Sequence, residues 1–111
     1  MVVYALIEIT IEDNEMYAEY VKTVRSIVEQ HHGRYLVRGG TVTPLSGNWC
    51  PERLVVIEFP SSTDLRRCFR SPEYQRIASL RERSTKSKAV MIEGFSSGTP
   101  DELDNLRGAK K

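Results

Sequence analysis

The sequence has few of the features that most often identify a chemistry. Its 111 residues include only two cysteines and two histidines, so a zinc site or a disulfide framework has almost nothing to be built from. It contains no glycine-rich phosphate loop, no nucleophile elbow and no Ser/His/Asp arrangement. Its 16 basic and 15 acidic residues leave a formal net charge of +1. Such a chain has no global field that would attract nucleic acid.

A long uninterrupted apolar run is also missing. The apolar residues 1–7 are followed by Glu8, and no basic region precedes them, so they resemble neither a secretion signal nor a membrane span. We therefore expect a cytoplasmic protein that does not contact a membrane. In that compartment Cys50 and Cys68 are expected as reduced thiols. Two arginines precede Cys68 and would favour a reactive thiolate, but free cysteine is more often a small buried apolar residue.

The sequence does contain a regular succession of strand and helix patterns. Apolar alternation predicts strands, and three- and four-residue spacing predicts two helices between them. The first helix begins near residue 13 and is expected to end at Gly33, where a left-handed cap costs least. The second begins near residue 61 and restarts at Ser71-Pro72, a favoured cap and first helical position. The expected strands cover residues 2–11, 35–38, 53–59 and 89–93.

The order of these elements predicts an α+β fold. A strand-helix-strand-strand-helix-strand order with right-handed crossovers gives a ferredoxin-like βαββαβ domain. Its antiparallel sheet has the order 4-1-3-2, with both helices on one face. We expect this domain to occupy residues 1–95. Residues 96–111 offer few apolar side chains and are expected to be a flexible C-terminal tail, with a capping-box sequence that favours a short helix.

The sheet face that the helices leave open is expected to bind a second copy. Small proteins rarely leave a sheet face exposed when it carries apolar residues. Pairing with an identical chain would close two sheets around a shared interior, which is the dimeric α/β barrel. The residues expected on this open face are Tyr4, Leu6, Leu54, Val56 and Met91.

Strand alternation also places charged residues on the open face. Because Ile7 and Ile9 are expected to face the helices, Glu8 should point away from them, and the same reasoning applies to Glu58 and Glu93. Arg38 on the outer strand could be their counter-charge. Such a cluster could form a polar pocket in which a buried glutamate serves as a general acid or base. A solvated or ion-paired face without a catalytic task is the alternative, and it is favoured.

Two other clusters favour structural roles. The adjacent His31 and His32 point in different directions, and no Asp, Glu or Cys at suitable spacing completes a metal site. The arginines of residues 66–83 could meet phosphates, but acidic residues are interleaved with them and no aromatic stacking motif accompanies them. We therefore predict no metal, no cofactor and no nucleic-acid partner.

Four segments resemble a known family. They are Arg38-Gly39-Gly40, residues 47–53 around Trp49, residues 56–60 around Glu58, and residues 71–75, which begin Ser-Pro-Glu-Tyr. Together they resemble the family of domain of unknown function 1330 over roughly residues 2–95. The resemblance implies a ferredoxin-like dimer and supplies no activity. The positions that match are Arg38, Gly39, Gly40, Trp49, Arg53, Glu58, Ser71, Tyr74 and Arg81, whereas Cys68-Phe69 departs from the usual aromatic pair.

Two functions remain open on the sequence. One is a small homodimeric protein that binds a small molecule in a pocket of the barrel and could be a cofactor-independent enzyme. The other is a non-catalytic dimeric module for regulation or interaction. Fold analogy cannot assign a reaction. The candidate pocket residues are Glu8, Arg38, Trp49, Arg53, Glu58, Ser71, Tyr74, Arg81 and Glu93.

Overall fold

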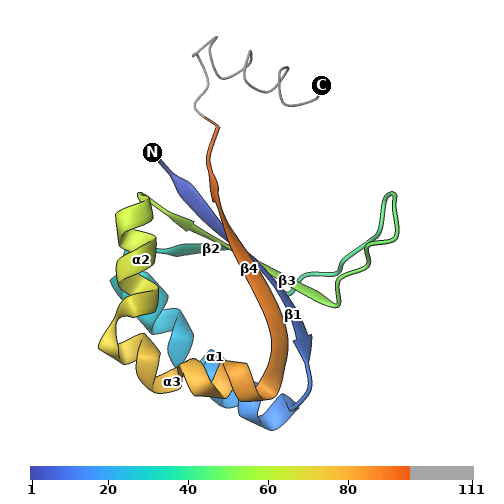
Figure 1. Ribbon diagram of the computed structural model, residues 1–111, viewed down its shortest axis with the longest axis horizontal. Coiled ribbons are helices and arrows are strands. Elements are labelled where there is room, and N and C mark those ends of the chain that lie inside the picture. Colours follow the sequence, from blue (N-terminus) through green and yellow to red (C-terminus); the bar gives the residue numbers. More distant parts are fainter. Residues whose placement is uncertain (96–111) are drawn as a thin grey trace.

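A sheet covered on one face by helices makes up the part of the chain that the computed structural model describes, residues 1–95 (Figure 1). The expected tail at residues 96–111 lies outside it. None of the helices within residues 1–95 is long and apolar enough to cross a membrane. The elements in order are β1 (Val3–Ile11), α1 (Asn14–Gln30), β2 (Arg34–Arg38), β3 (Arg53–Phe59), α2 (Ser62–Arg70), α3 (Pro72–Ser84) and β4 (Thr85–Glu93).

The sheet has the predicted topology. Its strands are antiparallel in the order β2-β3-β1-β4, which is the expected 4-1-3-2 read from the other edge. The helices lie together on one side of the sheet, and the connection between β2 and β3 extends away from the opposite side (Figure 1). β4 begins at Thr85, four residues before the expected start at Ala89, and pairs along the whole of β1. Alternation missed this start because the first residues of this edge strand are mostly polar.

Side-chain caps set the helix boundaries where the sequence predicted them. The carboxylate of Asp13 accepts a hydrogen bond from the backbone N–H of Met16 at 3.0 Å and begins α1. At the break between α2 and α3, the hydroxyl of Ser71 accepts from Tyr74 N–H at 3.1 Å and donates to the carbonyl of Cys68 at 2.7 Å. One buried hydroxyl therefore both ends α2 and starts α3.

The end of α1 differs from the expectation. The residue with positive φ is His32, at 70°, and not Gly33. Gly33 is needed for a different reason, since a Cβ atom there would lie 2.5 Å from Val28 Cγ1 and 2.8 Å from Phe59 Cε1. The glycine lets the turn pack against the core, where no side chain would fit.

The hydrophobic core lies between the helices and the sheet. Phe59, Val28 and Cys68 have no exposed surface. Burial raises the pKa of the Cys68 thiol to about 12, so this thiol stays protonated at neutral pH, as expected of a buried apolar residue. Cys50 is exposed. The buried hydrophobic residues are Val3, Ala5, Ile9, Tyr17, Tyr20, Val24, Ile27, Val28, Val55, Ile57, Phe59, Cys68, Tyr74 and Ala78.

The strand register decides which residues share each face. Directly opposed residues of antiparallel strands point to the same side, and Val3 and Ala5, which face the helices, oppose Glu93 and Met91 of β4. Glu93 and Met91 therefore lie on the helix side, and their predicted position on the open face is wrong. The alternation of apolar and polar residues gave no guide here, because residues 89–92 are all apolar. All four are exposed in the structure. The open face carries Tyr4, Leu6, Glu8, Leu54, Val56, Glu58, Lys88, Val90 and Ile92.

Candidate ligand-binding cleft

A cleft of about 390 Å³ lies between the sheet and the second helical segment. β1 and β4 form one wall, and α2 and α3 form the other. Most of its lining is apolar, and the polar groups of Tyr20, Tyr74 and Arg81 meet inside it. The lining residues are Ala5, Ile7, Tyr20, Leu65, Phe69, Tyr74, Gln75, Ala78, Arg81, Glu82, Ala89, Val90 and Met91.

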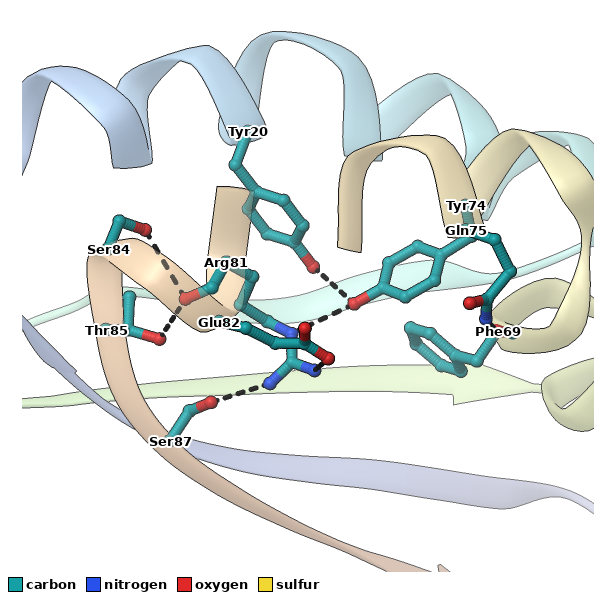
Figure 2. A network of polar contacts seen from close by, with 9 residues as sticks. All are labelled: Tyr20, Phe69, Tyr74, Gln75, Arg81, Glu82, Ser84, Thr85 and Ser87. Atoms are coloured by element: carbon teal, nitrogen blue, oxygen red, sulfur yellow. Dashed lines mark hydrogen bonds and ion pairs between the residues drawn. The ribbon is translucent and has the colours of Figure 1, made fainter. Parts of the chain in front are cut away.

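A chain of hydrogen bonds ties the polar groups of this cleft together (Figure 2). The hydroxyls of Tyr20 and Tyr74 are 2.9 Å apart. Arg81 Nε donates to the Tyr74 hydroxyl at 3.0 Å, and Arg81 Nη1 donates to Ser87 Oγ at 2.6 Å. Figure 2 shows Tyr20 reaching down from α1, Tyr74 and Arg81 coming from α3, and Ser87 from β4. The network therefore joins two helices, α1 and α3, to the edge strand β4.

The tyrosine pair keeps one hydroxyl proton to spare. Burial, reinforced by the adjacent Tyr74, raises the pKa of the Tyr20 hydroxyl far above its usual value, so Tyr20 stays neutral. Two neutral hydroxyls carry two protons, and the bond between them uses one. Within residues 1–95 no acceptor bonds the other proton. One hydroxyl proton of the pair therefore remains without an acceptor among residues 1–95.

Arg81 brings a permanent positive charge to the same place. Burial alone would lower the pKa of its guanidinium, but the tyrosine hydroxyls of Tyr74 and Tyr20 raise this pKa above its ordinary value. Its third nitrogen, Nη2, lies 4.0 Å from a carboxylate oxygen of Glu82, whose side chain is 66% exposed. The Arg81 guanidinium is therefore hydrogen-bonded to the hydroxyl groups of Tyr74 and Ser87. Its contact with the exposed Glu82 carboxylate is longer, at 4.0 Å.

A second, smaller cavity of about 30 Å³ adjoins the cleft beneath α1. Ile7, Tyr20, Phe69 and Arg81 line both spaces. Two further arginines reach the small cavity from β2 and β3. Its remaining lining consists of Ile9, Tyr17, Val21, Val24, Tyr35, Arg38, Arg53, Val55 and Ile57.

Arg53 is held at this cavity by an aromatic ring and a glycine. Its Nε donates to the Tyr17 hydroxyl at 3.2 Å, and its guanidinium carbon lies 5.6 Å from the centre of that ring. Gly39, with φ of 75°, is next to it, and a Cβ there would collide with the guanidinium of Arg53. Arg38 lies over the ring of Tyr35 at 5.2 Å. The Arg-Gly-Gly segment and Arg53 are therefore parts of one local structure.

The structure divides the predicted site between the two faces of the sheet. Arg38, Arg53, Tyr74 and Arg81 come together on the helix side. Ser71 caps α3 and lines neither space. The expected place of Arg38 on the open face is wrong, because an irregularity in the pairing between Tyr35 and Val37 shifts the alternation by one residue. Arg38 consequently opposes Val55, which faces the helices.

The predicted carboxylates lie elsewhere and pair with their neighbours. On the open face Glu8 is 3.6 Å from Lys88 Nζ and accepts a hydrogen bond from Trp49 Nε1 at 3.4 Å. Glu58 pairs with Arg34 at 2.9 Å, and not with Arg38. Glu93 is exposed at the end of β4. No pocket of three carboxylates forms, and within residues 1–95 no cluster of His, Cys, Asp or Glu could hold a metal ion.

Sequence reasoning missed Tyr17, Tyr20 and Ser87. The signal for the two tyrosines was present, since they stand three residues apart on the buried face of a helix. A buried phenol needs a hydrogen-bond partner, so two of them on one helix face indicate a polar group within the core. Ser87 carried no such signal, because it lies in the part of β4 that alternation did not identify.

Similar solved structures share this architecture at low sequence identity. A protein of unknown function from Rhodopseudomonas palustris, RPA0582, is 17% identical with a TM-score of 0.74, covering 86% of this chain and 83% of its own. SnoaB, a cofactor-independent oxygenase from Streptomyces nogalater, is 13% identical with a TM-score of 0.62, covering 86% and 95%. HapK from Hahella chejuensis is 13% identical with a TM-score of 0.61, covering 87% and 96%. No curated protein sequence matches the chain.

The sheet order, the helix layer and these likenesses define the class. The fold is ferredoxin-like, as in SnoaB and in a putative antibiotic biosynthesis monooxygenase from Nitrosomonas europaea, and the sheet of this single chain is open on one face. The chain belongs to the family DUF1330, a domain of unknown function, which it matches over residues 2–95. This family membership agrees with the resemblance seen in the sequence.

Proposed function

We propose that the protein is a homodimer in which each subunit binds a small, largely apolar molecule in the helix-side cleft. One observation carries the proposal: a 390 Å³ cleft with mostly apolar walls contains the hydrogen-bonded group Tyr20-Tyr74-Arg81. Ligand sites of this size typically combine apolar walls with a few fixed polar groups that orient the ligand. The walls would provide affinity, and the network would select a ligand with a hydrogen-bond acceptor.

The homodimer is supported by the composition of the open face. Leu6 of the central strand lies between Val56 and Val90, and Val90 is 56% exposed. The described helices all cover the opposite side, so they leave this surface to another molecule (Figure 1). A second copy is the simplest cover, because a self-complementary face closes under a two-fold axis. Trp49, which is 56% exposed, adds an aromatic edge to the same surface.

An oxygenase reaction is the second candidate, favoured by the likeness to SnoaB. If such a reaction uses general-base catalysis, it needs a base within hydrogen-bond reach of the substrate proton. The only carboxylate among the residues that line the cleft is Glu82, which is exposed at its edge. Tyr20 stays protonated and Arg81 stays charged, so both are donors. This donor set suits the binding of an acceptor group better than proton abstraction, and it also suits a non-catalytic regulatory module.

Binding can be tested with 2-naphthamide and 2-naphthoate, two flat probes that differ in charge. We expect at least one of them to saturate the protein in calorimetric or fluorescence titrations. Ala89 lies on the helix side of β4 and is exposed in the cleft, so Ala89→Phe should fill the space and abolish binding. Ala18→Phe, the same change on an exposed position of α1, is the matched control and should bind normally.

Two results would contradict the proposal. One is the failure of both probes to bind while native mass spectrometry of protein from cells finds no copurified small molecule. The other is binding that Ala89→Phe leaves unchanged, since the probe would then occupy another surface. A copurified molecule that gains oxygen atoms during incubation in air would instead favour the oxygenase.

A further inference from the structure

We propose that the ligand is a carboxylic acid whose carboxylate occupies the 30 Å³ cavity between Arg38, Arg53 and Arg81 while its apolar body fills the adjoining cleft. This inference rests on the proposed function and specifies the class of ligand. Ile7, Tyr20, Phe69 and Arg81 line both spaces, so the two spaces are adjacent, and the proposed ligand would lie across both.

The charges around the cavity favour an anion. Its lining residues include three arginines and neither Asp nor Glu. Within residues 1–95 neither Arg38 nor Arg53 lies within 4.0 Å of an acidic side chain. A cavity walled by apolar residues and lined by one sign of charge concentrates the field on whatever enters it. Among residues 1–95, Arg38 and Arg53 therefore have no acidic partner, and Arg81 has only the exposed Glu82 at 4.0 Å, so a ligand can neutralise these charges.

The hydrogen-bond donors are placed for the same purpose. Arg53 uses Nε for the Tyr17 hydroxyl, and its two terminal nitrogens, which lie beside Gly39, make no hydrogen bond within residues 1–95. A guanidinium edge of this kind binds the two oxygens of a carboxylate side by side. The spare hydroxyl proton of the Tyr20-Tyr74 pair adds one further donor where the cavity meets the cleft.

The size of the cavity selects the kind of anion. About 30 Å³ has room for one or two water-sized groups. A planar carboxylate matches that space and the flat guanidinium, whereas a tetrahedral phosphate is bulkier. The apolar body would lie against the small and aromatic side chains of the cleft, Ala5, Ala78 and Phe69.

The test compares probes of equal shape on the intact protein. We expect 2-naphthoate to bind at least about tenfold more tightly than 2-naphthamide, since a charge-assisted bond to arginine is stronger than a neutral one. The affinity for naphthoate should fall with added salt and the affinity for the amide should not. We expect 2-naphthyl phosphate to bind more weakly than naphthoate.

Two variants test whether the preference for 2-naphthoate over 2-naphthamide arises in the cavity. Arg53→Gln should remove most of the tenfold difference while keeping the binding of 2-naphthamide, which also shows that the variant is folded. Arg83→Gln, at an exposed arginine of α3, should keep the full difference. Equal binding of acid and amide, tighter binding of the phosphate, or a preference that survives Arg53→Gln would overturn the carboxylate site and leave the proposed function standing. Failure of all three probes, together with no copurified small molecule in native mass spectrometry, would overturn the proposed function itself.

Discussion

The two faces of the sheet differ in how their polar side chains are paired. On the helix side, the hydroxyl and guanidinium groups of Tyr20, Tyr74 and Arg81 are joined to one another between packed layers. On the open face, Glu8 and Glu58 form ion pairs with lysine and arginine side chains that are mostly exposed. Fixed donors in a low-dielectric cleft can select a ligand, whereas exposed ion pairs contribute little energy. The contrast shows that charge alone does not identify the functional face.

The largest effect is expected from a charge placed at the centre of the open face. Leu6 lies on β1, which is hydrogen-bonded to both β3 and β4, so Leu6→Lys would bury an unpaired ammonium group in the proposed dimer. We expect light scattering after size exclusion to show twice the chain mass for the natural protein and the mass of one chain for the variant. A natural protein that elutes as a monomer, or a variant that stays dimeric, would remove the open face as the interface.

A smaller effect should separate the two faces within a single strand. Val55 faces the helices and is 6% exposed, and its neighbour Val56 lies on the open face. Val55→Ala should lower the free energy of unfolding by about 2 kcal/mol at every protein concentration, because it leaves a cavity in the core. Val56→Ala should act through the dimer, so its cost should grow as the protein concentration rises. Denaturant titrations at two concentrations measure both, and identical behaviour of the two variants would contradict the division into faces.

The smallest effect is expected for Glu58→Gln. Glu58 pairs with Arg34, whose side chain is 70% exposed, so the loss should be below about 1 kcal/mol in thermal or chemical unfolding. The naphthoate and naphthamide affinities should be unchanged, since Glu58 lies across the sheet from the cleft. Weaker probe binding would show that the two faces are coupled and that the family-matching glutamate belongs to the site after all.

The sequence predicted most where one face of an element is buried. Alternation placed the residues of β1 and β3 correctly because both are inner strands, and Ile57 with Phe59 can only face the core. The order of elements then determined the sheet topology. The restart at Ser71-Pro72 was also predicted, because its cap is purely local chemistry.

The candidate site was less predictable because it depends on tertiary register. One pairing irregularity after Tyr35 moved Arg38 to the helix side, and no pattern in five strand residues indicates such a shift. Trp49 lies in a connection without periodicity, so its bond to Glu8 could not be foreseen. Pattern reasoning therefore found several members of the cleft without finding their shared location.

The position of β1 in the middle of the sheet has a consequence for how the chain is made. This strand is synthesised first, yet one of its two neighbours is β4, with Val3 paired opposite Glu93. Its hydrogen bonds therefore connect residues far apart in sequence, and such non-local pairing slows folding. During synthesis on the ribosome, the edge of β1 that pairs with β4 therefore stays unpaired until β4 has emerged. The complete sheet, and with it the Arg81 to Ser87 bond across α3 and β4, can form only after β4 has been synthesised.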